Sequence, residues 1–241
     1  MKEVRFFYTP SPLKGELPSD EAQHALRVLR MGIGDELYLM DGQGRFHRAI
    51  ITEADNHHCR YRIEESIEQQ PEWHGSIHLA VAPTKHMDRM EWLAEKATEV
   101  GWDRLTLLNC RFSERKVVKT DRLEKIVIAA MKQSHKAWKP QVEETESFKQ
   151  FITRKDLPEQ RFIAHCYDEA ELSGGSKPFL LDVLLSQQPA LVLVGPEGDF
   201  SVDEVKAAEV NGFRPVSLGS SRLRTETAAL VAVHLMRLAN R

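Results

Sequence analysis

The sequence predicts an α/β fold, in which a small β-rich unit precedes a larger domain built on a mostly parallel sheet. From Ser76 onward, short apolar runs alternate with segments of helical spacing, and this order gives a parallel sheet covered by helices. Before residue 70, partly alternating strands are broken by turn residues, which indicates a compact barrel. We place the two domains at 1–70 and 71–241, joined at a polar stretch, Gln69-Gln70-Pro71-Glu72.

In the N-terminal unit, local signals predict one helix and one hairpin. The helix begins at Ser19-Asp20-Glu21, places Ala25, Val28 and Leu29 on one face, and ends at Gly32. Asp41-Gly42-Gln43-Gly44 separates two partly alternating segments and is a favourable hairpin turn. The unit is therefore expected to be a small barrel with one short helix.

The larger domain is expected to contain five strand–helix pairs. The helix at 86–101 has Met90, Ala94 and Ala97 at helical spacing and Gly101 at its end. The last helix is apolar almost all round, so we expect it to be buried between partners. The predicted pairs are 76–83 with 86–101, 104–109 with 121–138, 161–166 with 179–187, 190–195 with 201–212, and 213–219 with 225–240.

Composition is that of an ordinary globular protein. Of the 241 residues, 41% are hydrophobic and 29% are charged, and no apolar run approaches the length of a membrane span or a signal-peptide core. The three cysteines, at 59, 110 and 166, are far apart and show no metal-ligand spacing. We therefore expect reduced thiols in a cytoplasmic protein that holds no metal and does not bind a membrane.

The charge is unevenly distributed. The net charge is −3, yet residues 104–139 contain ten Lys and Arg against three Asp and Glu. A locally positive face can bind phosphates even when the whole chain is slightly acidic. A solvated helix surface is the other interpretation of the same stretch.

The strand at 190–194 ends in an unusual turn, Gly195-Pro196-Glu197-Gly198-Asp199. Ligands of open α/β sheets bind beyond the carboxyl ends of the strands, and glycines let backbone approach a ligand closely. Ser201 and Glu204 then form a capping box that starts a helix. Taken alone, this turn is more typical of a purely structural strand-to-helix connection, and it is not a Walker A loop.

A second loop of the same kind follows one strand–helix unit later, in SLGSSRLRTETAAL at 217–230. If the two strands are neighbours, the two loops lie side by side, and Arg222, Arg224 and Glu226 converge near Glu197. Mixed Arg and Glu side chains around glycines suit a ligand with amino, carboxylate and adenine groups. The alternative for Arg224 and Glu226 is a salt bridge at the helix start.

Together, LVGPEGDFSVDE and LGSSRLRTETA resemble the ribosomal RNA small subunit methyltransferase E family, within the SPOUT class of methyltransferases. The resemblance covers nearly the whole chain. Four further stretches match the family pattern in order and spacing: HALRVLRMGIGDEL at 24–37, KHMDRMEWLAEKATEVG at 85–101, RFSERKV at 111–117 and MKQSHKAWKP at 131–140.

The resemblance implies a fold, a cofactor and a reaction. Members have a PUA-like, OB-like barrel followed by an α/β domain with a deep trefoil knot, although chains rarely thread loops. The knot loops bind S-adenosylmethionine and release S-adenosylhomocysteine. Members act as homodimers and methylate N3 of one uridine in 16S rRNA within the assembled small subunit.

The resemblance also assigns residues. Arg224, Glu226 and Glu197 are the catalytic candidates. Asp199 stands where the family usually has glycine, and Ser221-Arg222 where it usually has Arg-Ile. We expect Asp199 to cap the helix that starts at Ser201, so that Asp199→Gly leaves methyl transfer largely intact. The cofactor-binding residues implied are Leu193, Val194, Gly195, Pro196, Glu197, Gly198, Leu218, Gly219, Leu223, Arg224, Thr227 and Ala228.

Methyl transfer to N3 requires loss of the N3 proton. Arg224 is our choice for the cation that stabilises the uridine anion, and Glu226 or Glu197 for the proton acceptor. Another SPOUT-type reaction, on a ribose 2′-OH, and a non-catalytic RNA-binding assembly factor remain open as alternatives. We expect rRNA phosphates to be bound by Arg27, Arg30, Arg45, Arg48, Arg111, Arg115, Lys116, Lys132 and Lys136.

Overall fold

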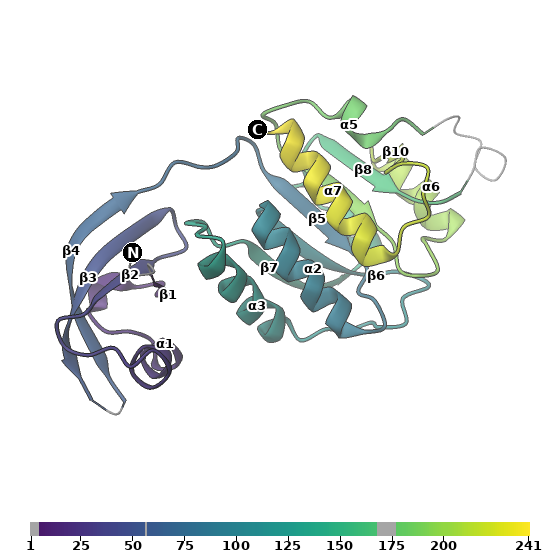
Figure 1. Cartoon of the computed structure of the whole chain (residues 1–241). Helices are drawn as coiled ribbons and strands as arrows, with labels where there is room; N and C mark the ends of the chain where they lie inside the picture. The colour runs from purple at the N-terminus through teal and green to yellow at the C-terminus, as the bar shows by residue number, and fades with distance from the viewer. Residues whose placement is uncertain (1–4, 56, 168–176) are drawn as a thin grey trace. The chain divides into compact units, whose positions relative to one another are not determined.

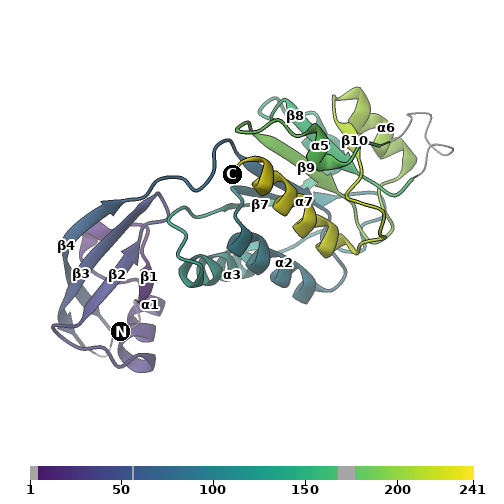
Figure 2. The same ribbon diagram turned by 45° about the horizontal axis from the view of Figure 1, so that its top comes forward.

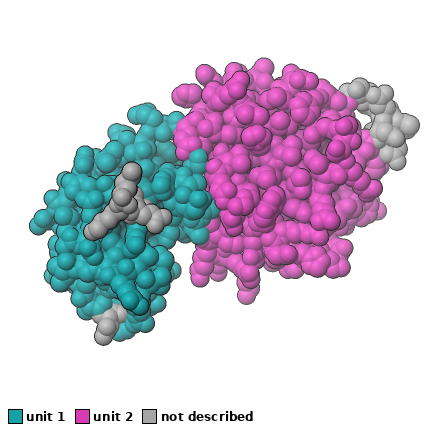
Figure 3. Space-filling view, in the orientation of Figure 1, with its two compact units in different colours: residues 1–71, 128–139 teal, residues 72–127, 140–241 magenta. Residues whose placement is uncertain are grey.

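The computed structural model describes residues 5–55, 57–167 and 177–241. The chain forms two compact units (Figure 3). Unit 1 consists of residues 1–71 and 128–139, and unit 2 of residues 72–127 and 140–241. Helix α3, Thr120–Gln133, therefore contributes residues to both units. No helix in the described ranges is both long and apolar enough to cross a membrane.

Unit 1 is built on a mixed four-stranded sheet in the order β1-β2-β3-β4. β1 and β2 pair in parallel and the other neighbours are antiparallel. The predicted hairpin turn is confirmed: Asp41 Oδ1 accepts the backbone N–H groups of Gln43 at 2.7 Å and Arg45 at 3.0 Å. The strands are β1 Phe6–Tyr8, β2 Glu36–Met40, β3 Arg45–Ala54 and β4 Cys59–Glu68.

The helix of unit 1 changes its winding part-way. A short 3-10 turn, Pro12–Lys14, precedes α1, Ser19–Gln23, which continues as a π-helical turn, His24–Val28. The expectation that Val28 shares the buried face of Ala25 is wrong, since Val28 is 67% exposed. The wider π turn shifts the residue period and carries Val28 away from the core.

Unit 1 also takes in a segment from the middle of the chain. The Gly44 N–H donates to the Ala137 carbonyl at 3.0 Å, and the Lys139 N–H to the Gly42 carbonyl at 2.9 Å. The Trp138 ring lies against Gly44, where a Cβ atom would overlap it. The prediction that the helix reaches Trp138 is wrong: α3 ends at Gln133, because the following backbone pairs with the hairpin turn.

Unit 2 contains a six-stranded sheet with the order β10-β8-β9-β5-β6-β7, in which every pair is parallel (Figure 1). The predicted α/β class with a parallel sheet and a small β-rich N-terminal unit is confirmed. The trefoil knot stays a prediction. The strands are β5 Ile77–Val81, β6 Arg104–Asn109, β7 Gln141–Ser147, β8 Gln160–Ala164, β9 Ala190–Val194 and β10 Arg214–Val216.

Helices cover both faces of this sheet. Ile77, Leu79 and Val81 of β5 pack with α2 and α7 on one face, whereas Ala80 belongs to the core beneath α4 and α6. Figure 2 shows α6 on the opposite side of the sheet from α2 and α7. The helices are α2 Met87–Val100, α4 Phe148–Ile152, α5 Leu180–Val183, α6 Val202–Val210 and α7 Thr225–Ala239.

Two parts of unit 2 differ from the prediction. β7 and α4 were not predicted at all. The helix predicted at 179–187 is only the short α5, which ends at Val183. The reason is Gln160, whose side chain accepts the Leu185 N–H at 2.6 Å and donates to the Leu185 carbonyl at 3.1 Å, which holds that backbone out of a helix.

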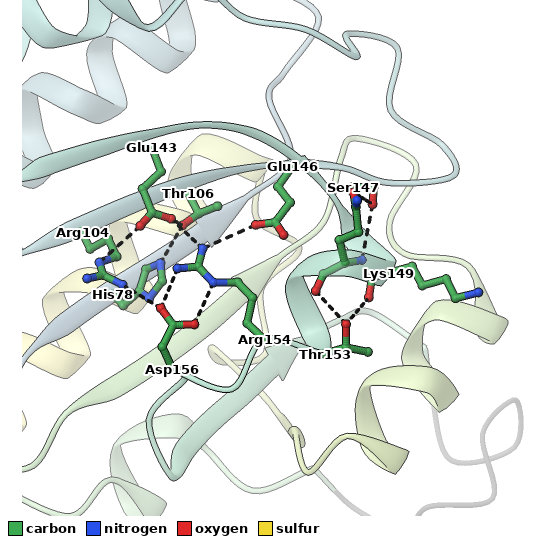
Figure 4. A network of polar contacts seen from close by, with 11 residues as sticks. His78, Arg104, Thr106, Glu143, Glu146, Ser147, Lys149, Thr153, Arg154 and Asp156 are labelled. Carbon is green, nitrogen blue, oxygen red and sulfur yellow. Dashed lines mark hydrogen bonds and ion pairs between the residues drawn. The ribbon is translucent and has the colours of Figure 1, made fainter.

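A polar network lies toward the amino ends of β5, β6 and β7 (Figure 4). His78 Nε2 lies 2.8 Å from Thr106 Oγ1, which donates to Glu143 Oε2 at 2.6 Å. Arg154 donates to the same Glu143 oxygen at 2.9 Å and to Asp156 at 2.7 Å. Burial, together with the nearby Arg104, lowers the pKa of His78 to about 3, so this imidazole is neutral.

Candidate functional site

A cavity of about 980 Å³ opens at the carboxyl ends of β8, β9 and β10. Ala164, Val194 and Val216, the last residues of these three strands, all lie in its lining. The position is the one where open parallel sheets bind ligands, because the loops that leave the strands can surround a molecule there. The cavity lies within unit 2.

The turn after β9 forms one wall. A Cβ atom on Gly195 would lie 3.0 Å from the Phe200 nitrogen, so any other residue would crowd the turn as it folds back. The turn closes with a hydrogen bond from the Asp199 N–H to the Pro196 carbonyl at 2.9 Å. The predicted capping box of α6 is confirmed, with Ser201 and Glu204 each bonding the other's backbone N–H.

The loop from β10 to α7 forms a second wall. Ser217 Oγ accepts the Gly219 N–H at 3.1 Å, and Gly219 has a φ of 122°, which favours glycine. Arg222 and Arg224 line the cavity, and both are exposed. Arg224 is the N-cap residue of α7, so its guanidinium stands where the loop becomes a helix.

The expectation that the two loops follow neighbouring strands is wrong. β8 lies between β9 and β10: Phe162 of β8 pairs with Val192 on one side and Arg214 on the other. Strand order in such a sheet need not follow the order along the chain. Both loops nevertheless reach the same cavity, and the end of β8 adds a third wall between them.

This third wall is the β8 corner, residues His165–Tyr167, and four hydrogen bonds hold it. Cys166 donates its N–H to Asp199 Oδ2 at 2.7 Å, and Tyr167 Oη donates to the Phe200 carbonyl at 2.7 Å. Lys177 Nζ donates to the carbonyls of His165 at 2.7 Å and Tyr167 at 2.5 Å. The corner is thereby attached to the β9 turn and to the chain that approaches α5.

Asp199 does not cap α6, and that expectation is wrong. Its Oδ1 accepts the Phe200 N–H at 2.7 Å, while Oδ2 bonds Cys166 across the cavity wall. Ser201, not Asp199, provides the side-chain cap of α6, and both Asp199 oxygens are taken by donors outside the helix.

Burial affects both polar side chains at the β8 corner. It lowers the pKa of His165 to about 4, and the positive charge of Lys177 adds to this effect. The His165 imidazole is therefore neutral near pH 7. Burial also raises the pKa of the Cys166 thiol, as does the negative charge of Asp199.

Comparison with known proteins identifies the family. Residues 71–237 match the model of a family described as an RNA methyltransferase domain, and residues 17–64 match an RNA methyltransferase PUA domain. A protein of Rickettsia conorii named ribosomal RNA small subunit methyltransferase E is 30% identical over 227 residues, which cover 93% of this chain and 90% of that protein. The chain belongs to the ribosomal RNA small subunit methyltransferase E family. A Synechocystis protein of the same name is 31% identical, covering 90% of this chain and 70% of its own.

Solved structures agree with this family assignment. A probable rRNA-methyltransferase from Porphyromonas gingivalis is 42% identical, with a TM-score of 0.90 and 98% of each chain covered. The methyltransferase E of Neisseria gonorrhoeae, bound to S-adenosyl methionine, is 28% identical, with a TM-score of 0.83 and 98% of each chain covered. The resemblance seen in the sequence is thus confirmed, and the N-terminal unit contains the family's PUA domain.

Most residues assigned by the resemblance to methyltransferase E proteins meet at the cavity. Leu193 is instead buried in the core on the α4 and α6 face, and Thr227 lies outside the lining. Those that line the cavity are Val194, Gly195, Pro196, Glu197, Gly198, Leu218, Gly219, Leu223, Arg224 and Ala228.

Of the three predicted catalytic residues, two line the cavity and one does not. Arg224 and Glu197 line the cavity, whereas Glu226 is 7% exposed and lies behind the lining. Glu226 Oε1 is 3.8 Å from Nε of Arg89, a cavity residue, and its Oε2 has no hydrogen-bond partner among the described residues. Glu197 Oε1 accepts the Lys85 backbone N–H at 2.9 Å.

The expected RNA-binding residues are divided between the two units. Some are already paired: Lys132 lies 2.6 Å from Glu21, and Arg48 bonds Glu36 at 3.2 Å. Arg27, Arg30, Arg45, Arg48, Lys132 and Lys136 belong to unit 1, and Arg111, Arg115 and Lys116 to unit 2. The basic stretch at 104–139 is therefore not one continuous face of a single unit.

Sequence reasoning missed the residues at the end of β8. The rule that located the other loops, a polar turn after a buried strand, applies equally to His165-Cys166-Tyr167, but no glycine marked the site. Among the described residues, no group of three or more His, Cys, Asp and Glu side chains could hold a metal ion. The missed lining residues are Arg89, Ala164, His165, Cys166, Tyr167, Lys177, Asp199, Val216, Ser217, Ser220 and Thr225.

Proposed function

We propose that the chain transfers the methyl group of S-adenosylmethionine to N3 of one uridine in 16S rRNA, within the assembled small ribosomal subunit. The supporting observation is the cavity at the ends of β8, β9 and β10, in a chain of the methyltransferase E family. A relative from Neisseria gonorrhoeae, named ribosomal RNA small subunit methyltransferase E, binds S-adenosyl methionine in its crystal structure.

The cavity residues fit this cofactor. A volume of about 980 Å³ is at the upper end for small-molecule sites, which leaves room for a nucleobase beside the cofactor. Leu218, Leu223 and Ala228 offer apolar surface, and the turn at Gly195 brings bare backbone to the wall. Arg222 and Arg224 can bind a carboxylate. When bound, S-adenosylmethionine supplies an electrophilic methyl group.

This chain's own residues must prepare the uridine. The N3 of uracil is a poor nucleophile until its proton leaves, and negative charge then develops on the base. The Arg224 guanidinium stays charged at every working pH and stands at the cavity wall, so it can stabilise that charge. Glu197 and Glu226 are the two candidate proton acceptors, and of these Glu197 lines the cavity.

Nucleoside analysis tests the proposed reaction. Small subunits from a strain lacking this gene are incubated with the protein and methyl-labelled S-adenosylmethionine, and their 16S rRNA is digested to nucleosides. We expect label in 3-methyluridine. Label in a 2′-O-methylated nucleoside would establish the alternative SPOUT-type reaction. An absence of label, with no calorimetric binding of S-adenosylmethionine, would establish a non-catalytic RNA-binding factor.

We also propose that the chain acts as a homodimer, as the resemblance to the family implies. Two observations support it: α7 is largely apolar, and Trp92 on the neighbouring α2 is 41% exposed. Light scattering after size-exclusion chromatography should give twice the monomer mass of 27.6 kDa. A monomer mass at micromolar concentration would contradict it.

A further inference from the structure

Asp199 has a backbone conformation that glycine adopts more easily than aspartate. Its φ is 64°, in the left-handed region where a Cβ atom crowds the following carbonyl oxygen. Glycine would fit this backbone with less strain, so the contacts of the carboxylate decide what the aspartate adds here.

The two carboxylate oxygens of Asp199 have different tasks. Oδ1 bonds the Phe200 N–H at 2.7 Å and so stays within the β9 turn. Oδ2 bonds the Cys166 N–H at 2.7 Å and so reaches the β8 corner. The last paired residues of β8 and β9 are Ala164 and Val194. This hydrogen bond therefore joins the loops that follow the two strands, beyond the end of the sheet.

We propose that Asp199 is a positioning residue that holds the β8 corner, His165–Tyr167, as a fixed wall of the cavity. Hydrogen bonds to a carboxylate are stronger than those between neutral groups. Asp199 therefore contributes more than the neutral bond from Tyr167 Oη to the Phe200 carbonyl, which joins the same two loops. We call the hydrogen bond from the Cys166 N–H to Asp199 Oδ2 the clamp. The clamp does not depend on the ligand, whereas its effect on S-adenosylmethionine binding rests on the proposed function.

The clamp prepares the cavity for its ligand. A loop already fixed in its bound position loses little conformational entropy on binding, so the affinity is higher. Asp199 acts through the Cys166 backbone and not on the reacting atoms. Its loss should therefore raise the dissociation constant and the KM for the cofactor while kcat at saturation stays within about twofold.

Two substitutions separate the clamp from general damage to the fold. Asp199→Gly removes both hydrogen bonds but suits the left-handed φ, so the variant should fold. Asp199→Asn tolerates the same φ and keeps one acceptor oxygen, so it should rescue part of the effect. Tyr167→Phe removes the neutral bond and serves as the comparison.

The first measurement is calorimetric binding of S-adenosylhomocysteine. Because a charge-assisted hydrogen bond is lost, we expect the dissociation constant to rise about tenfold in Asp199→Gly. Asp199→Asn and Tyr167→Phe should show smaller increases. Equal affinity in Asp199→Gly and the wild type would overturn the cofactor part of the proposal.

The second measurement needs no cofactor. Iodoacetamide alkylation of Cys166 is followed by peptide mass spectrometry, with buried Cys59 and Cys110 as internal controls. Loss of Asp199 removes a charge that raises the pKa of this thiol and frees the corner, so both effects speed the reaction. We expect about tenfold faster alkylation in Asp199→Gly and an intermediate rate in Asp199→Asn.

The two measurements distinguish the possible failures. Asp199→Asn removes the same charge as Asp199→Gly but keeps an acceptor oxygen, so equal Cys166 alkylation rates in these two variants would overturn the clamp, whatever ligand the cavity binds. Faster alkylation in Asp199→Gly than in Asp199→Asn, in a protein whose wild type binds no S-adenosylhomocysteine, would uphold the clamp and contradict the proposed function.

Discussion

Glu197 joins the β9 turn to the loop after β5, because its Oε1 accepts the Lys85 backbone N–H at 2.9 Å. The Lys85 carbonyl in turn accepts from Arg115 Nη2 at 2.8 Å, on the loop after β6. A carboxylate at the cavity wall therefore belongs to a chain of contacts through three strand-end loops. This position gives Glu197 a structural task besides any role as proton acceptor.

Substitutions at Glu197 separate these two roles. Glu197→Gln keeps an oxygen that can accept the Lys85 N–H, so we expect S-adenosylhomocysteine binding within a few-fold of the wild type. Glu197→Ala removes the link and should weaken S-adenosylhomocysteine binding by about tenfold. Calorimetry and single-turnover methylation of small subunits measure the two effects. A loss of kcat of about 10²-fold or more in Glu197→Gln would establish Glu197 as the proton acceptor, whereas methyl transfer within a few-fold of the wild type would remove Glu197 from that role.

Arg224 should matter for the reaction more than for cofactor binding. If its charge stabilises the uridine anion, Arg224→Ala should lower the single-turnover rate by about 10²-fold, with a much smaller change in S-adenosylhomocysteine affinity. Arg222→Ala is the matched comparison, since Arg222 is exposed in the same loop. Equal losses in both variants would show that the loop's total charge is required and that Arg224 has no special role.

Local signals in the sequence were enough for much of the fold. The spacing of apolar residues placed α2, and a capping box placed the start of α6. β7 could not be predicted, because QVEETES contains one aliphatic residue, Val142. The strand lies at the edge of the sheet, so burial leaves no alternating pattern of apolar residues in it. The end of α3 was predicted wrongly, because it is determined by a non-local contact with the hairpin turn at Gly42–Gly44.

The site was predictable in the same partial way. Glycines marked the loops after β9 and β10, and both loops do line one cavity. Their spatial relation was not encoded locally, since β8 enters the sheet between them. The wall that β8 contributes carries no glycine, and Asp199, which holds it, had the appearance of a helix cap.

Arg154 should stabilise unit 2 through Glu143. Burial raises the pKa of Glu143, but hydrogen bonds from Arg154 and Thr106 outweigh this and keep the pKa below its usual value. Arg154→Met leaves this carboxylate, whose side chain is 16% exposed, with only the longer 3.5 Å ion pair to Arg104 Nε, and should cost about 2 kcal/mol of unfolding free energy. Arg122→Ala breaks a pair whose guanidinium side is 74% exposed, so its effect in the same urea titration should stay below about 1 kcal/mol. Equal losses of unfolding free energy in the two variants would contradict the stabilising role of Arg154.

His78 should make stability depend on pH. Its pKa is about 3 in the folded chain and about 6.5 when unfolded, so the unfolded state binds the proton first. The neutral histidine thus contributes stability above pH 6.5 that is lost as the pH falls toward 3, by up to about 1.4 kcal/mol per pH unit. His78→Leu should be less stable at pH 8 yet show a shallower slope between pH 6.5 and 4.5 in urea unfolding. Parallel slopes would assign the pH dependence to other groups.

Exposed basic residues should contribute to RNA binding more clearly than paired ones. Arg45 and Lys116 are exposed, whereas the side chain of Lys132 is 23% exposed and lies 2.6 Å from Glu21. If Arg45 and Lys116 contact phosphates, replacing either with Ala should weaken binding to small subunits and reduce the slope of log K against log salt by about one. Lys132→Ala should mainly destabilise unit 1, because Glu21 loses its partner. The control is Lys206→Ala, which changes an exposed residue on α6. If Arg45→Ala and Lys116→Ala leave the salt slope unchanged, neither residue belongs to the RNA interface.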